Sequence, residues 1–86
     1  MGTRFVRYTV QTELHLGNMV EGELGLPVDR AEALRRVEAW VALRREQGLF
    51  VRVGDDGTWA TASGPRTRAS ITAAPELVED WPTTQA

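Results

Sequence analysis

The chain has 86 residues, a formal net charge of −2, no cysteine and a single histidine, which excludes a disulfide framework and a Cys/His zinc site. Its length suffices for one small domain, which we expect to span residues 1–81, with residues 82–86 as a frayed tail. All ten basic residues are Arg, so a catalytic mechanism that uses a Lys Schiff base or a Lys general base is excluded. Arg without Lys, together with abundant Ala, Gly and Val, is typical of a protein from an actinobacterium or one of its phages. No segment is apolar enough for a signal peptide or a membrane span, so we expect a cytoplasmic protein.

The first predicted element is a strand over residues 4–12, because β-branched and aromatic residues alternate there with polar ones. Gly17 and Asn18 are suited to a tight turn, so residues 19–24 are predicted to return as a second strand. The glycines at positions 22 and 25 favour a bulge or bend in this hairpin.

A long helix is predicted over residues 29–47. Asp29 and Glu32 have the spacing of a capping box at its start, and Gly48 suits the position after its end. One face is apolar, as helical periodicity requires of a helix that covers a sheet, and it consists of Ala33, Leu34, Val37, Trp40 and Val41.

Two further strands are predicted at residues 49–54 and 58–63, separated by an acidic turn. The adjacent Asp55 and Asp56 diverge and lack the following Glu of a calcium loop, so the segment is interpreted as a turn and not a metal site. A two-residue turn would place Trp59 on the face of Phe50 and Arg52. We favour a three-residue loop, which pairs Val53 with Trp59 and directs Trp59 into the core.

The remaining segments are a loop at residues 63–68, a fifth strand at residues 69–74 and a short helical turn from Pro75 to Trp81. The predicted fold class is therefore α+β, an antiparallel sheet of four or five strands with one long helix (about 29–47) packed on one face, in the order β-β-α-β-β-(β). One helix leaves the other face of such a sheet uncovered. We expect a partner or a second copy to bind either this face, where Phe5 and Phe50 would lie, or an open edge strand.

The candidate functional residues suggest binding and not catalysis. His15 lies in no nucleophile motif, and no catalytic, cofactor-binding or metal-binding residues are predicted. A small enzyme centred on His15 and the acids of residues 21–23 remains as a third alternative to the two binding functions. We expect a small non-enzymatic regulator that binds a partner protein, as a monomer or a homodimer, with no membrane contact. The alternative is a nucleic-acid-binding regulator with an arginine patch at Arg4, Arg7, Arg66 and Arg68, although the acidic net charge counts against nucleic acid. The candidate partner-binding residues are Arg4, Phe5, Arg7, Arg66, Arg68 and Trp81.

Overall fold

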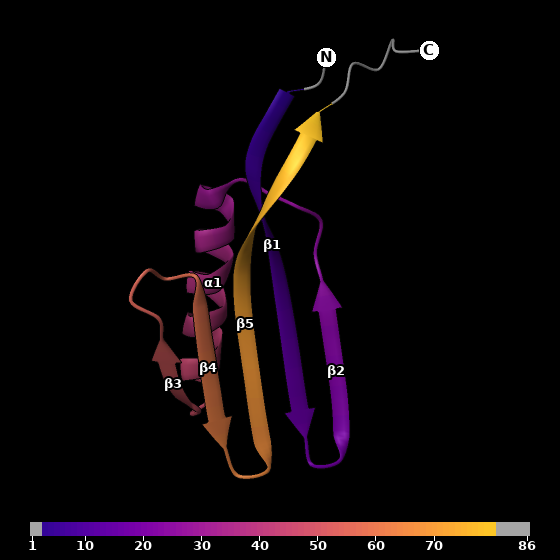
Figure 1. Cartoon of the computed structure of the whole chain (residues 1–86). Coiled ribbons are helices and arrows are strands. Elements are labelled where there is room, and N and C mark those ends of the chain that lie inside the picture. Colours follow the sequence, from indigo (N-terminus) through magenta and orange to yellow (C-terminus); the bar gives the residue numbers. More distant parts are fainter. Residues whose placement is uncertain (1–2, 81–86) are drawn as a thin grey trace.

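The computed structural model describes the backbone of residues 3–80 and the side chains of residues 6–77. Within these residues, five strands form one antiparallel sheet and a single helix packs on it, which confirms the predicted α+β class (Figure 1). The strands lie side by side in the order β2-β1-β5-β4-β3. In chain order the elements are β1 (Thr3–Leu16), β2 (Met19–Leu24), α1 (Arg30–Glu46), β3 (Phe50–Val53), β4 (Trp59–Gly64) and β5 (Thr67–Asp80).

The two central strands are much longer than the others. β1 and β5 have 14 residues each, about 45 Å at the usual rise of a strand, and they pair along their whole length. The N-terminal end of β1 and the C-terminal end of β5 project beyond the helix as a two-stranded ribbon (Figure 1).

The predicted helical turn after residue 74 is wrong, because β5 continues through Pro75 to Asp80. Pro75 lies opposite Tyr8, whose backbone N–H and C=O bond to Val28 on the other side of β1. The nitrogen of Pro75 therefore faces the free edge of β5, where a missing N–H removes no ladder hydrogen bond. Trp81 and the predicted tail at 82–86 lie outside the described residues.

Both tight hairpins close with two-residue turns. Gly17, with φ 59°, and Asn18 connect β1 to β2, which confirms the first predicted hairpin. Between β4 and β5, the predicted loop at 63–68 shrinks to Pro65 and Arg66. Arg66 has φ 58°, a left-handed conformation that disfavours residues with a side chain.

The connection between β2 and α1 continues to follow β1. The Gly25 N–H donates to the Val10 carbonyl, which continues the β1–β2 register. The next bridge joins Tyr8 to Val28 and is displaced by one residue from that register, so the connecting segment contains one extra residue opposite β1. The extra residue forms the bulge that was predicted from the glycines.

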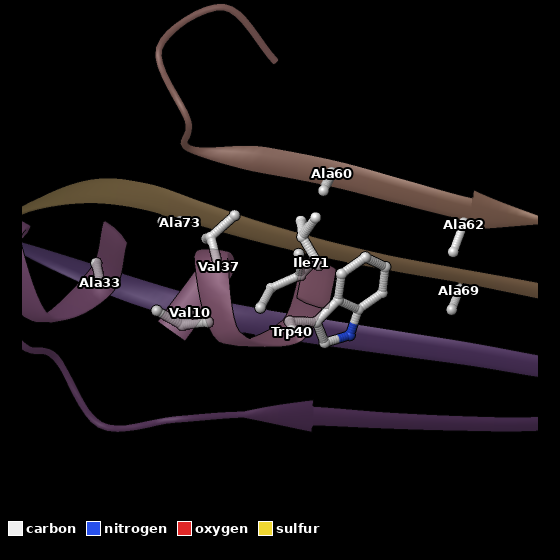
Figure 2. Packing of buried hydrophobic residues seen from close by; sticks show 10 residues of the cluster. Val10, Ala33, Val37, Trp40, Ala60, Ala62, Ala69, Ile71 and Ala73 are labelled. Atoms are coloured by element: carbon white, nitrogen blue, oxygen red, sulfur yellow. The ribbon is translucent and has the colours of Figure 1, made fainter. Parts of the chain in front are cut away.

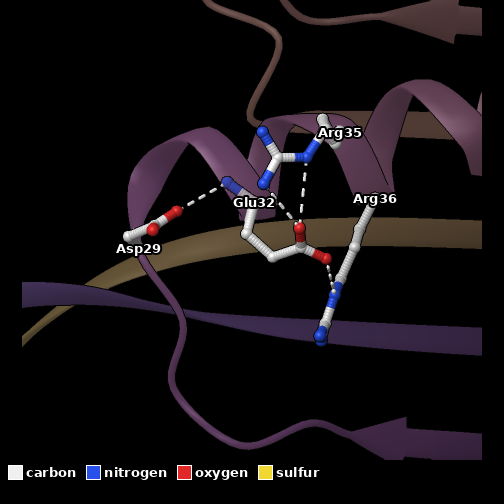
Figure 3. Close-up of polar contacts among 4 residues, drawn as sticks. All are labelled: Asp29, Glu32, Arg35 and Arg36. Carbon is white, nitrogen blue, oxygen red and sulfur yellow. Dashed lines mark hydrogen bonds and ion pairs between the residues drawn. The ribbon is translucent and has the colours of Figure 1, made fainter.

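The helix begins and ends as its sequence predicts. The Asp29 carboxylate accepts a hydrogen bond of 2.7 Å from the Glu32 N–H, and Gly48 follows the last turn with φ 81°. The Glu32 carboxylate does not complete the capping box but accepts from Arg35 and Arg36 (Figure 3). These hydrogen bonds, the one from Arg35 first, lower the pKa of Glu32 below its ordinary value of 4.5.

The core between helix and sheet is built largely from small side chains (Figure 2). The predicted helix face supplies four buried residues, Ala33, Val37, Trp40 and Val41. The sheet supplies Val10, Ala60, Ala62, Ala69, Ile71 and Ala73. Alanines let the helix approach the sheet closely, but each buries little apolar area, so packing alone gives this core a modest stability.

The predicted three-residue loop between β3 and β4 is wrong. The Gly54 N–H bonds to the Trp59 carbonyl at 2.9 Å, and Val53 lies opposite Ala60, so four residues, 55–58, form the loop. This register is the one that the alternative two-residue turn implied, although the loop is longer. It directs Ala60 and Ala62 toward the helix and Trp59 to the uncovered face with Phe50 and Arg52, where Trp59 is 41% exposed. The prediction placed the large apolar residues of this hairpin in the core. In the structure α1 lies so close to β4 that only alanine fits at positions 60 and 62.

Candidate functional site

The face of the sheet opposite α1 is mostly polar. Residues directly opposite each other on paired strands share a face, so the register assigns every side chain to one side. The centre of the uncovered face carries Thr9, Gln11, Glu13, His15, Thr61, Ser63, Arg68, Ser70 and Thr72. Such a composition is typical of a sheet face in contact with water, and it disfavours a dry face-to-face sandwich with a second sheet.

Two aromatic residues and one arginine interrupt this polar surface at its β3–β4 side. Phe50 is 68% exposed, Arg52 is exposed between the two aromatic positions, and Trp59 lies on the same face. We call these three residues the aromatic–arginine stripe. Tryptophan, arginine and exposed aromatic rings are enriched at the centres of protein interfaces.

The position of the Trp59 ring is fixed by Gly54. A Cβ atom at position 54 would lie 2.3 Å from Trp59 Nε1 and 2.6 Å from Cε2, so the indole rests directly on the glycine backbone. Gly54 itself is buried beneath the ring. Trp59 is therefore held in place before any partner arrives, which reduces the entropy lost on binding.

The structure does not bring the four candidate arginines together. Arg7 lies opposite Glu76, whereas Arg68 lies opposite His15, eight residues further along β1 and about 26 Å away. The backbone of Arg4 lies opposite Glu79, close to Arg7 in the ribbon, and the side chains of Arg4 and Phe5 are outside the described part.

Arg66 and Arg68 line a hollow of about 750 Å³ between the two hairpin turns. His15 and Asn18 contribute from the β1–β2 side, and the Gly17 N–H bonds to the Arg66 carbonyl at 2.9 Å. The hollow is wide and open, and its positive charge comes from two exposed side chains. The arginine patch is thus divided between the two ends of the sheet.

His15 has no catalytic arrangement in the described residues. Its Nε2 lies 2.8 Å from the Glu13 carboxylate on the surface, and both side chains are nearly half exposed. Glu21 and Glu23, the other acids near it in sequence, point to the opposite side of the sheet, because their partners in β1 are Leu14 and Thr12. A site that combines His15 with these two acids is therefore not assembled.

The acidic turn is held by its own side chains. The Asp56 carboxylate accepts from the Thr58 hydroxyl at 2.7 Å and from the Thr58 N–H at 3.0 Å. The hydrogen bond from the Thr58 hydroxyl, the larger effect, lowers the pKa of Asp56 below its ordinary value of 3.8. Over the described residues, no three metal-ligating side chains cluster and no helix has the length and hydropathy to cross a membrane.

The predicted partner-binding residues include none from β2, although the structure exposes several large apolar side chains on and beside this strand. Every residue of β2 is exposed, and α1 packs on the other four strands, with only long side chains such as Trp40 and Arg44 lining hollows beside β2. We call the exposed apolar residues Met19, Val20, Leu24 and Leu26 the β2 margin; they are between 61% and 84% exposed. The sequence signal was the mixture of apolar residues and glutamates in a short strand, which suits an outer strand that nothing covers.

Comparison of the chain with protein-family models, with curated protein sequences and with solved structures yields no match in any of the three.

Proposed function

We propose that this chain is a small non-enzymatic protein-binding module and that the aromatic–arginine stripe anchors its partner. The observation that carries the proposal is the exposure of Phe50 and Trp59 on one face, with Arg52 between them. A partner that covered both rings would remove about 100 Å² or more of apolar surface from each, worth about 2–3 kcal/mol per ring before the costs of association.

The rest of the uncovered face supports a partner with a polar rim. Hydroxyl and amide side chains surround the stripe toward the centre of the sheet, where Thr61, Ser63 and Thr72 are its neighbours. An apolar centre bordered by groups that form hydrogen bonds is the usual composition of a separable protein interface. We therefore propose a partner that associates and dissociates, such as the target of a regulator.

The proposal is tested by affinity capture with matched variants. Immobilised wild-type protein, Phe50→Ser and Leu43→Ser are incubated with nuclease-treated lysate of the source organism, and bound proteins are identified by mass spectrometry. Leu43 is the control, since it is an apolar, 47% exposed residue of α1, which lies on the other side of the sheet from the stripe. We expect a protein that the wild type and Leu43→Ser retain and Phe50→Ser loses; capture that never depends on Phe50 would contradict the proposal.

A second candidate function is binding of single-stranded nucleic acid, and the stripe is also the observation that favours it. Exposed aromatic rings on a sheet can stack on bases, and Arg52 and Arg68 lie on the same face as the two rings. The net charge of −2 and Glu13 on this face oppose it. Fluorescence anisotropy of labelled single-stranded oligonucleotides across a salt series distinguishes the two functions, because phosphate contacts make the affinity fall steeply with salt.

A further inference from the structure

The outer edge of β2 has unused backbone hydrogen-bonding groups. The Gly25 N–H donates to Val10, and bonded pairs alternate along an antiparallel ladder, so the β2 residues that bond to β1 are Met19, Glu21 and Glu23. The N–H and C=O groups of Val20, Gly22 and Leu24 point away from the sheet. β2 is one of the two edge strands of the sheet and contains neither Pro nor Lys; its charged residues are Glu21 and Glu23, which oppose pairing only with a strand of like charge. Another strand can therefore add to it.

The two faces of β2 differ in chemistry. Val20 and Leu24 lie on the uncovered face of the sheet, and Glu21 and Glu23 lie on the helix side. Neither glutamate forms an ion pair within the described residues. The arginines on the helix side have other partners: Arg36 bonds to Glu32, and Arg44 bonds to Gln47 and stacks on the Trp40 ring. Arg36 and Arg44 line the hollows beside these glutamates but bond elsewhere. An added strand would therefore meet two carboxylates without an ion-pair partner on one face and two aliphatic side chains on the other.

Gly22 leaves a gap in the aliphatic face. A Cβ atom at this position would lie 3.5 Å from the Thr12 carbonyl oxygen, an ordinary contact, so the fold has room for a side chain there. The glycine separates Val20 from Leu24 and leaves bare backbone between them. A large ring on a neighbouring strand can cover such a glycine from the opposite position.

We propose that the β2 edge binds an extended segment of a partner protein as an added antiparallel strand in which apolar and basic residues alternate. Opposite Leu24, Glu23, Gly22, Glu21 and Val20, the segment reads apolar, basic, aromatic, basic, apolar. Backbone hydrogen bonds supply affinity, and the two glutamates supply selectivity for arginine or lysine. This inference rests on the proposed protein-binding function but uses the opposite margin of the sheet, about 19 Å from β3.

Charge argues against a second copy of this chain as the occupant. When two copies of β2 pair around a two-fold axis with complete overlap, Gly22 lies opposite Gly22 of the other copy. Glu21 of each copy then lies opposite Glu23 of the other. Like charges directly opposite each other on adjacent strands destabilise the pairing. A basic partner strand replaces both repulsions by attractions.

The test uses two synthetic nine-residue peptides and the full chain. One peptide contains valine, arginine, phenylalanine, lysine and valine in this order between polar ends, and the other replaces the two basic residues with glutamate. Binding is measured by isothermal titration calorimetry at low salt. We expect the basic peptide to bind at least about tenfold more tightly, and we expect the double variant Glu21→Lys/Glu23→Lys to reverse the preference.

Two further variants separate edge pairing from general charge attraction. Gly22→Pro removes one outward N–H that bonds to nothing within the chain, so binding should weaken about tenfold while the fold remains. Glu38→Lys/Glu46→Lys makes the same charge change on exposed positions of α1 and should leave the peptide preference intact.

Equal affinity for the two peptides, or full binding by Gly22→Pro, would overturn the proposal. So would a wild-type dimer in sedimentation velocity that Gly22→Pro dissociates, since β2 would then be occupied by a second copy. Phe50→Ser should bind the basic peptide as the wild type does. If the peptides do not bind β2, the proposal that the aromatic–arginine stripe captures a partner is unaffected. If capture does not depend on Phe50, the measured binding of the peptides to β2 is equally unaffected.

Discussion

Replacing Gly54 with alanine should destabilise the protein, and the reason is the ring that rests on it. The new Cβ would lie 2.3 Å from Trp59 Nε1 and 2.6 Å from Cε2, whereas carbon atoms in contact are about 3.5–4.0 Å apart. Gly54 does not have a left-handed φ, so alanine suits its backbone and only the ring must move. The indole would have to lift off the β3–β4 end of the sheet.

The size of the effect follows from the area that the ring covers. Trp59 is 41% exposed, so it buries about 150 Å², and lifting the ring would return about half of this area to water. That loss is worth about 2 kcal/mol, and the reduced backbone freedom of alanine in the unfolded chain offsets about 0.5–1 kcal/mol of it. We expect Gly54→Ala to lower the free energy of unfolding by about 1 kcal/mol.

A double-mutant cycle measures the contact itself. In a Trp59→Ala background the obstruction is absent, so Gly54→Ala should stabilise the chain by about 0.5–1 kcal/mol, which gives a coupling energy of about 2 kcal/mol. Urea unfolding followed by far-UV circular dichroism is the suitable assay, since it does not depend on the tryptophan that is removed. If Gly54→Ala changed stability equally in both backgrounds, the ring would not rest on Gly54 and the reasoning would be refuted.

Three other changes test the core, a turn and the helix start. Val37→Ala, at a side chain that is 2% exposed, should cost about 2–3 kcal/mol in thermal unfolding, and a loss below about 1 kcal/mol would mean that α1 does not pack on the alanine surface. Arg66→Gly should raise stability by up to about 1 kcal/mol because φ 58° is unfavourable for arginine, and a clear decrease would contradict this. The folded-state pKa of Glu32 is lowered, so its contribution is present above its ordinary pKa of 4.5 and disappears as the pH falls through the lower folded value. Urea unfolding at a series of acidic pH values should therefore show that the free energy of unfolding falls less with decreasing pH in Glu32→Gln than in the wild type.

The local elements could be predicted because their signals are local. The cap at Asp29, the apolar face around Val37 and the turn at Gly17 each depend on residues within a few positions of one another. The extension of β5 beyond residue 74 could not, because Pro75 is tolerated only where its nitrogen faces a free edge. That edge exists because β4 is shorter than β5, a property of the assembled sheet.

The candidate site was less predictable than the fold. The sequence left two places open for Trp59, the core or the face of Phe50 and Arg52, and the structure selects the second, which the sequence analysis did not favour. The predicted patch of four arginines would need Arg7 and Arg68 to be neighbours, but they lie beside opposite ends of β1, and an extended strand keeps its ends far apart. The order of the strands in the sheet puts β2 at an edge that α1 does not cover. No local sequence pattern encodes this order.

By itself, the sequence determined the order of the helix and strands up to residue 74 and most of the residues that α1 buries, since hydrophobic periodicity and capping act over a few residues. Only the tertiary structure decided where Trp59 points. A shift of one residue in the β3–β4 register exchanges the two faces, and the free energy that selects the register comes from the helix packed against Ala60 and Ala62. The close fit of α1 to these alanines excludes the large ring from the core and leaves it on the surface, where a partner can reach it.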